Sequence, residues 1–120
     1  MRFIITGKGG SYVNAIEPLL NIPTDSELLV LKPSEIKNFV TDGVPTKIIY
    51  IHITFMQHWD YWMFGDIRNE YNNKKFIEEV LEYRDFGKED CDCYKEFNGT
   101  GLNDLAEDIN YYIKDCITNA

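Results

Sequence analysis

Residues 7–11 read Gly-Lys-Gly-Gly-Ser, a glycine-rich turn with one cation and one hydroxyl group. Such residues suit a phosphate, because glycines let the backbone approach an anion closely and a lysine supplies positive charge. An apolar, β-branched run precedes the turn and a helical pattern follows it, which is how α/β proteins position phosphates. We therefore predict phosphate or nucleotide binding by Gly7, Lys8, Gly9, Gly10 and Ser11.

A structural explanation of the same turn stays open. Lys8 can be a solvated residue on a tight turn. Gly9 and Gly10 suit a strand-to-helix turn that needs positive φ, whatever binds there. The turn by itself therefore does not identify a ligand.

The segment 55–64, FMQHWDYWMF, concentrates aromatic residues and methionines. Trp, Tyr and Met are enriched at the cores of protein interfaces, so we predict a partner-binding patch. Its residues are Trp59, Tyr61, Trp62 and Phe64. The alternative is that most of these side chains cover the protein's own core. Stacking of single-stranded bases is disfavoured, because no basic groove surrounds the segment.

Metal binding and conventional acid–base catalysis have little support. His52, His58, Cys91 and Cys93 are conceivable zinc ligands, but Cys-x-Cys is not the usual spacing and no further pair completes the set. We instead expect His52 to be a buried, hydrogen-bonded residue of a central strand. The chain contains neither a Gly-x-Ser-x-Gly nor a His-Glu-x-x-His motif.

Composition predicts one domain over residues 1–120, since 44% apolar residues can form a single core. A net charge of −8 opposes binding to nucleic acid or an anionic membrane and favours a basic partner. The acidic residues Glu89, Asp90 and Asp92 are best explained as a solvated face, with docking onto a basic partner as the alternative. No apolar run reaches the roughly 18 residues of a membrane span, and the first residues do not resemble a signal peptide. Three cysteines, an odd number, suit reduced thiols, so we expect a cytoplasmic protein.

Hydrophobic patterns place the elements along the chain. We expect strands at residues 2–6, 27–31, 47–54 and 93–97. We expect helices from Tyr12 to Pro23, from Pro33, over much of 56–84, and after Gly101, with a polar loop at 85–92. Strands that alternate with helices predict a three-layer α/β fold, with a small, mostly parallel sheet of about four strands and helices on both faces.

The stretch FIITGKGGSYVN resembles the Walker A loop of P-loop nucleotide-binding proteins, whose pattern is Gly-x4-Gly-Lys-Ser/Thr. Tyr12, Val13 and Asn14 stand where the second glycine, the lysine and the hydroxyl residue belong. The resemblance implies loss of the lysine that bridges the β and γ phosphates and of the hydroxyl that holds Mg²⁺. Lys8 resembles the signature lysine of deviant Walker A proteins, which reaches a phosphate and would replace part of the lost charge.

The second half of the chain resembles the carboxyl-terminal half of nucleoside monophosphate kinases. The similarity lies in KIIYIHIT, EYRDFGKED and YKEFNGTGLNDLAEDINYYI, and it implies phosphate contacts from Arg68 and Arg84. We therefore expect a shortened P-loop protein of viral or mobile-element origin that binds a nucleotide, such as ATP with Mg²⁺, or a protein partner without catalysing transfer. Two alternatives stay open: an active kinase that uses Lys8, Arg68 and Arg84, and an acidic inhibitor that acts through the aromatic patch.

Overall fold

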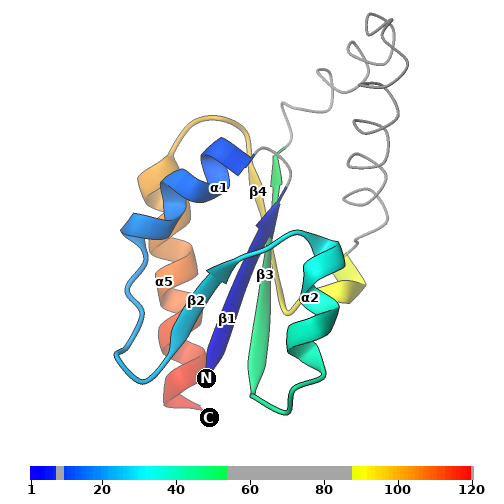
Figure 1. Ribbon diagram of the computed structural model, residues 1–120. Coiled ribbons are helices and arrows are strands. Elements are labelled where there is room, and N and C mark those ends of the chain that lie inside the picture. Colours follow the sequence, from blue (N-terminus) through cyan, green and yellow to red (C-terminus); the bar gives the residue numbers. More distant parts are fainter. Residues whose placement is uncertain (8–9, 54–87, 120) are drawn as a thin grey trace, which may run out of the picture.

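The computed structural model describes residues 1–7, 10–53 and 88–119, and within them strands alternate with helices (Figure 1). The described strands are β1 (Arg2–Gly7), β2 (Glu27–Val30), β3 (Thr46–Ile53) and β4 (Cys93–Phe97). The described α-helices are α1 (Gly10–Ile16), α2 (Pro33–Val40) and α5 (Leu102–Thr118), and the short 3-10 helices are η1 (Glu17–Leu19) and η2 (Lys88–Asp90). The expected helical segment 56–84 lies outside the described residues.

The four strands form one parallel sheet in the order β2-β1-β3-β4. From β1 the chain moves outward to β2 on one side, and it then crosses back to place β3 on the other side of β1. This reversal puts a topological switch point at the carboxyl ends of β1 and β3, where open α/β sheets bind their ligands. The expected α/β fold with a four-stranded parallel sheet is confirmed.

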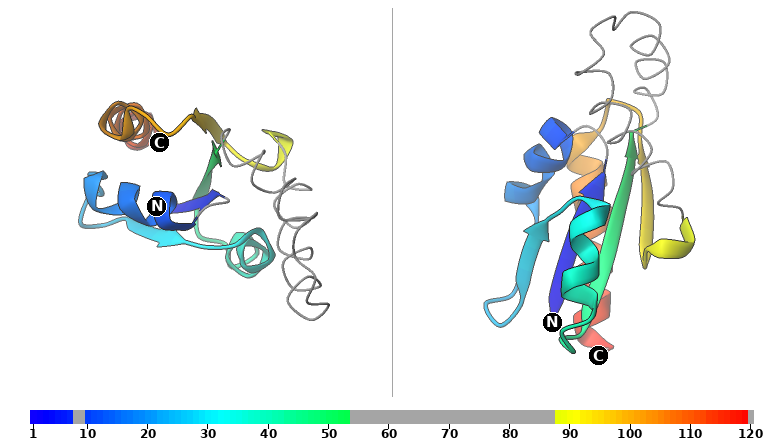
Figure 2. Two further views of the ribbon diagram at one scale, coloured as in Figure 1. Left: turned by 90° about the horizontal axis from the view of Figure 1, so that it is seen from above. Right: turned by 45° about the vertical axis from the view of Figure 1, so that its right-hand side comes forward.

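Helices cover both faces of the sheet, as expected for three layers. Helices α1 and α5 lie on one side, here called the first face, and α2 lies on the second face (Figure 2). The main core fills the first face, where the strands contribute Phe3, Ile5, Ile49, Ile51, Cys93 and Phe97. Because side chains alternate along a strand, the residues between these belong to the second face.

Helix α5 confirms the helix expected after Gly101, and one apolar stripe of it faces the sheet. Leu105, Ala106, Ile109 and Ile113 are buried, and Leu102, Tyr112 and Cys116 are partly buried against the same core. The period of three and four residues brings these side chains to the face that meets the sheet. In the described part of the chain, no helix combines the length and the apolar character that crossing a membrane requires.

The first helix begins and ends earlier than predicted. It starts at Gly10 rather than Tyr12, and it passes into η1 after Ile16 instead of continuing to Pro23. Pro18 lies in the first turn of η1. A proline lacks the backbone N–H and clashes with the preceding turn, so the α-helix cannot continue through it.

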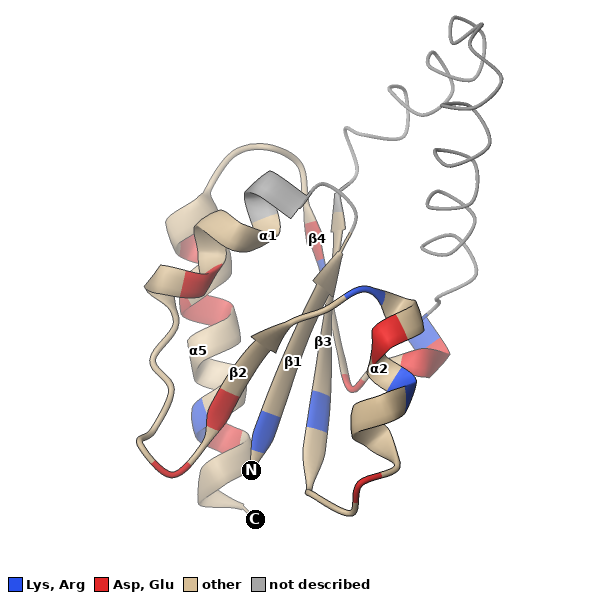
Figure 3. Cartoon of the chain, viewed as in Figure 1, with Lys and Arg blue, Asp and Glu red and all other residues tan. Residues whose placement is uncertain are grey.

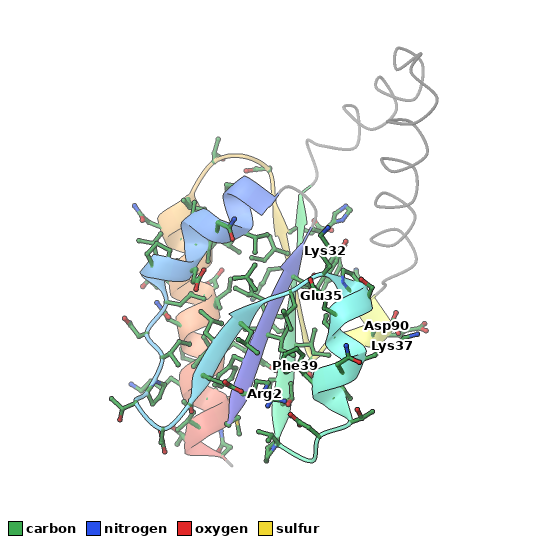
Figure 4. All side chains as sticks on the ribbon, viewed as in Figure 1. Arg2, Lys32, Glu35, Lys37, Phe39 and Asp90 are labelled. Carbon is green, nitrogen blue, oxygen red and sulfur yellow. The ribbon has the colours of Figure 1, made fainter. Side chains whose placement is uncertain are left out.

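Arg2 connects the amino ends of β1 and β2 to the end of α2 (Figure 4). Its Nε donates to Glu27 Oε1 at 2.6 Å, its Nη1 donates to the carbonyl oxygen of Phe39 at 3.0 Å, and its Nη2 lies 2.6 Å from Asp42 Oδ2. The guanidinium also lies 5.0 Å from the centroid of the Phe39 ring. These contacts satisfy a side chain that is buried at the edge of the sheet away from the switch point.

Candidate functional site

The candidate site lies at the carboxyl ends of β1 and β3. Gly7 ends β1 and pairs in register with Ile51 of β3. Helix α1 begins at Gly10, so residues 8 and 9 are the whole connection between strand and helix. The glycine-rich turn therefore follows the strand beside the switch point, while Gly10 and Ser11 belong to the first turn of α1 rather than to an extended loop.

Packing between strands explains why residue 7 is a glycine. A Cβ atom added there would lie 2.6 Å from the carbonyl oxygen of Ile51 and 3.0 Å from Cγ2 of Val13. The first distance is too short for real atoms, and a backbone oxygen of a paired strand cannot easily move away. The structural explanation therefore accounts for Gly7 without any ligand.

The position that corresponds to the Walker A lysine is part of the hydrophobic core. Val13 is 1% exposed and belongs to the first-face cluster with Phe3, Ile5 and Ile109. Asn14, at the position of the hydroxyl residue, is exposed. A side chain in place of Val13 would therefore enter the core between α1 and the sheet.

A row of polar and aromatic side chains crosses the carboxyl half of the second face. Thr6 of β1 pairs with Tyr50 of β3, and Tyr50 pairs with Tyr94 of β4. One step nearer the carboxyl edge, His52 pairs with Glu96. Buried parallel strands are normally rich in aliphatic residues, so this polar group is unusual for the fold. We refer to these five residues as the second-face cluster.

The rings of the second-face cluster lie nearly parallel to one another. Tyr50 and Tyr94 are 5.5 Å apart between centroids with 15° between their planes, and His52 lies 5.9 Å from Tyr94. The ammonium group of Lys88 lies 4.8 Å from the centroid of Tyr94. Burial, together with the carboxylate of Glu96, raises the pKa of Tyr94, so its hydroxyl keeps its proton and can donate a hydrogen bond.

Thr6 carries a buried hydroxyl group on the second face. The residue is 1% exposed, and its Oγ1 has no partner in the part of the chain that the structure describes. Most buried polar side-chain atoms in native proteins are paired, and leaving one unpaired costs about 1–3 kcal/mol. The Thr6 hydroxyl is therefore a destabilising feature of the second face.

An acidic cavity adjoins the cluster at the end of β4. Its volume is about 420 Å³, and its lining includes Glu96, Asn98, Thr100, Asp104 and Asp108. The Asn98 side chain accepts hydrogen bonds from the backbone N–H and the hydroxyl of Thr100, which shapes the turn into α5. Glu96 is exposed and belongs both to this cavity and to the second-face cluster.

The basic residues of β1 and β3 lie away from this edge. Figure 3 shows them near the amino ends of the two strands, where they are Arg2 and Lys47. The charged residues that line the cavity at the end of β4, namely Glu96, Asp104 and Asp108, are all acidic. A free anion would therefore meet repulsion there unless a cation accompanied it.

Most residues predicted to bind a ligand or partner lie outside the described residues. These are Lys8, Gly9, Arg68 and Arg84 of the nucleotide site and Trp59, Tyr61, Trp62 and Phe64 of the aromatic patch. Their roles remain predictions. Gly7 and Gly10 lie at the carboxyl edge of the sheet as the strand–turn–helix pattern required.

No group of three potential metal ligands occurs among the described residues. His52 does lie on an inner strand, but it is half-buried rather than buried. Cys91, Cys93 and Cys116 are free thiols. Glu89 and Asp90 are exposed as expected, whereas Asp92 Oδ2 also accepts a hydrogen bond of 2.8 Å from the Ile48 N–H.

Thr6, Tyr50, Tyr94 and Glu96 were not singled out by the sequence. A signal existed, because Tyr50 and His52 are two residues apart in one strand, as are Tyr94 and Glu96 in another. Such spacing places each pair on one face of its strand. Only the register between strands shows that both pairs and Thr6 share a face.

Comparison of the chain with protein families, with curated proteins and with solved structures found no match.

Proposed function

We propose that this protein binds a nucleotide, as its magnesium complex, at the carboxyl edge of β1 and β3 and does not catalyse phosphoryl transfer. The observation that carries this proposal is the burial of Val13. A lysine at this position of a P-loop bridges the phosphates during transfer, and a valine inside the core cannot do so. Binding without turnover suits a regulatory protein.

The position of the glycine-rich turn supports the binding half of the proposal. It follows β1 at the switch point of the sheet, where α/β proteins hold their ligands. Lys8 is the cation that we propose to contact a phosphate. The acidic residues of the neighbouring cavity favour a magnesium complex over the free nucleotide, because the complex carries less negative charge.

Calorimetric titration with ATP, GTP and deoxynucleoside monophosphates, with and without Mg²⁺, tests the proposal. We expect binding that requires Mg²⁺ and is lost in Lys8→Ala. Lys37→Ala is the matched control, because Lys37 is an exposed lysine of α2 and should leave binding unchanged.

Two results would contradict the proposal. The absence of heat with every nucleotide would reduce the turn to a structural feature and direct attention to protein partners of segment 55–64. Transfer of phosphate between nucleotides, measured by chromatography and lost in Lys8→Ala, would instead support an active kinase.

A further inference from the structure

We propose that a groove beside α5 binds a segment of a partner protein that combines Lys or Arg residues with a large apolar side chain. This inference is independent of the proposed function, because the groove is built from α5 and the segment before β2. Its volume is about 430 Å³, within the roughly 300–1,000 Å³ of typical ligand pockets. Pro23, Ile113 and Ile117 supply apolar surface in its lining, so it can take an apolar side chain.

Two hydrogen bonds hold the walls of this groove together. The Asn110 side chain donates to the carbonyl oxygen of Leu19 at 3.0 Å and accepts from the N–H of Asn21 at 2.7 Å. These bonds join α5 to a segment that is distant in the sequence, so the groove is formed before any partner arrives. A preformed groove lowers the ordering cost that association must overcome.

Tyr111 lies at the groove as an anchor for a partner. The residue is 76% exposed, the largest value among the exposed large hydrophobic residues of the described chain. A tyrosine supplies a large contact area with little loss of side-chain freedom, and its ring can stack on the cation of Arg or Lys. Tyrosine is also enriched among the residues that dominate binding energies. We therefore expect the partner to cover Tyr111.

Carboxylates along α5 favour a basic partner. Asp104, Glu107 and Asp108 are exposed on the amino-terminal half of the helix (Figure 3). The ion pairs within the described part of the chain engage none of them. Together with the net charge of −8, these carboxylates attract a cationic segment and repel an acidic one.

The order of charges along the groove fixes how the partner lies. Glu107 lines the groove nearest the amino end of α5, whereas Lys114, the one basic residue of the lining, lies about two turns further on. The cations of the partner therefore belong over the amino-terminal half of α5. Its apolar side chain belongs in the groove, against Ile113 and Ile117.

Selection from a library of random peptides displayed on phage tests which chemistry the wild-type protein binds. We expect the enriched peptides to combine Lys or Arg with Leu, Ile, Phe or Trp. The affinity of a synthetic copy, measured by calorimetric titration, should fall as the salt concentration rises, because exposed charges are screened. Absence of enrichment, or enrichment of peptides without basic residues, would overturn the proposal.

Two variants test whether the selected peptide lies on the groove. Tyr111→Ala should weaken its binding about 5- to 30-fold, as loss of an interface anchor does. Glu107→Gln should weaken it about 2- to 5-fold, the range of an exposed charge pair. Both residues are exposed, so both variants should keep the melting temperature of the wild type.

Val40→Ala and Glu89→Gln are the matched controls. They shorten an exposed apolar side chain of α2 and neutralise an exposed carboxylate of η2, away from the groove. Both should leave the affinity unchanged. Equal affinity of Tyr111→Ala and wild type would overturn the proposal. An equal loss in Glu89→Gln and Glu107→Gln would also overturn it, because the peptide would then respond to the overall charge rather than to the groove.

Discussion

Replacing Val13 by lysine tests whether the Walker A resemblance extends to three dimensions. The substitution restores the residue type that P-loop enzymes need at this position. In this protein, however, the side chain is 1% exposed and packs between α1 and the first face of the sheet. We expect Val13→Lys to destabilise the fold severely and to gain no phosphoryl transfer.

The magnitude follows from the charge and the volume of the new side chain. A lysine buried in an apolar site has a pKa near 5–6, against about 10.4 in the unfolded chain. At pH 7 the folded protein must hold it neutral, which costs roughly 1.4 kcal/mol for each of the three to four pH units involved, or about 5 kcal/mol. The extra volume costs about 1–3 kcal/mol more. Together they approach the 5–15 kcal/mol that typically stabilises a domain.

The pH dependence of the stability of Val13→Lys separates the cost of keeping the buried lysine neutral from the cost of its extra volume. Because the lysine pKa is lowered by folding, the unfolded state binds the proton, and the stability of the variant rises as the pH rises toward about 10. At pH 9.5 the cost of the charge falls to about 1 kcal/mol. Val13→Met, an apolar side chain of similar length, is the control and should show only the volume cost at both pH values.

Thermal unfolding followed by far-ultraviolet circular dichroism at pH 7 and pH 9.5 measures these effects. We expect Val13→Met to lower the melting temperature by roughly 4–12 °C at both pH values. Val13→Lys should be largely unfolded at pH 7 and recover at pH 9.5. Equal melting of the two variants at pH 7 would refute the burial of position 13. A gain of Mg-ATP turnover would refute the proposal of a non-catalytic protein.

Two further predictions concern stability. Gly7→Ala should lower the free energy of unfolding by about 1–3 kcal/mol, because the new Cβ would meet the carbonyl oxygen of Ile51. Urea denaturation measures this loss, and an unchanged urea midpoint of unfolding would disprove the contact. Gly43→Ala, which has open space but a φ of +83°, should show only backbone strain of about 1–2 kcal/mol. The hydrogen bond from Arg2 lowers the pKa of Asp42 in the folded protein. The ionised carboxylate therefore stabilises the fold at pH values above its ordinary pKa of about 3.9. This stabilisation is lost as the pH falls from that value through the lower pKa of the folded state. Asp42→Asn should therefore flatten the acid side of the stability curve, and an acid profile identical to wild type would argue against the ion pair.

Local patterns were sufficient to predict most of the described elements. The β-branched run of β3 and the apolar stripe of α5 led to correct assignments, because both signals arise from neighbours within a few residues. The predicted end of helix α1 was wrong. The prediction ended the helix at Pro23, whereas the nearer Pro18 interrupts it. The turn of residues 7–11 was correctly placed after a strand. The sequence did not decide whether its glycines bind a phosphate or only permit a tight strand-to-helix turn.

By itself the sequence determined the class of the fold, the order of its elements and the acidic character of the chain. The hydrophobic period and the charge are both found from the sequence alone, so predicting them required no knowledge of contacts between distant residues. Only the tertiary structure decided that β1 lies between β2 and β3, that Gly7 is required by the carbonyl oxygen of Ile51, and that Val13 points into the core. It also brought Thr6 into register with Tyr50 and Tyr94. The physical reason is that pairing between parallel strands joins residues far apart in the chain, and several pairings satisfy the same local pattern.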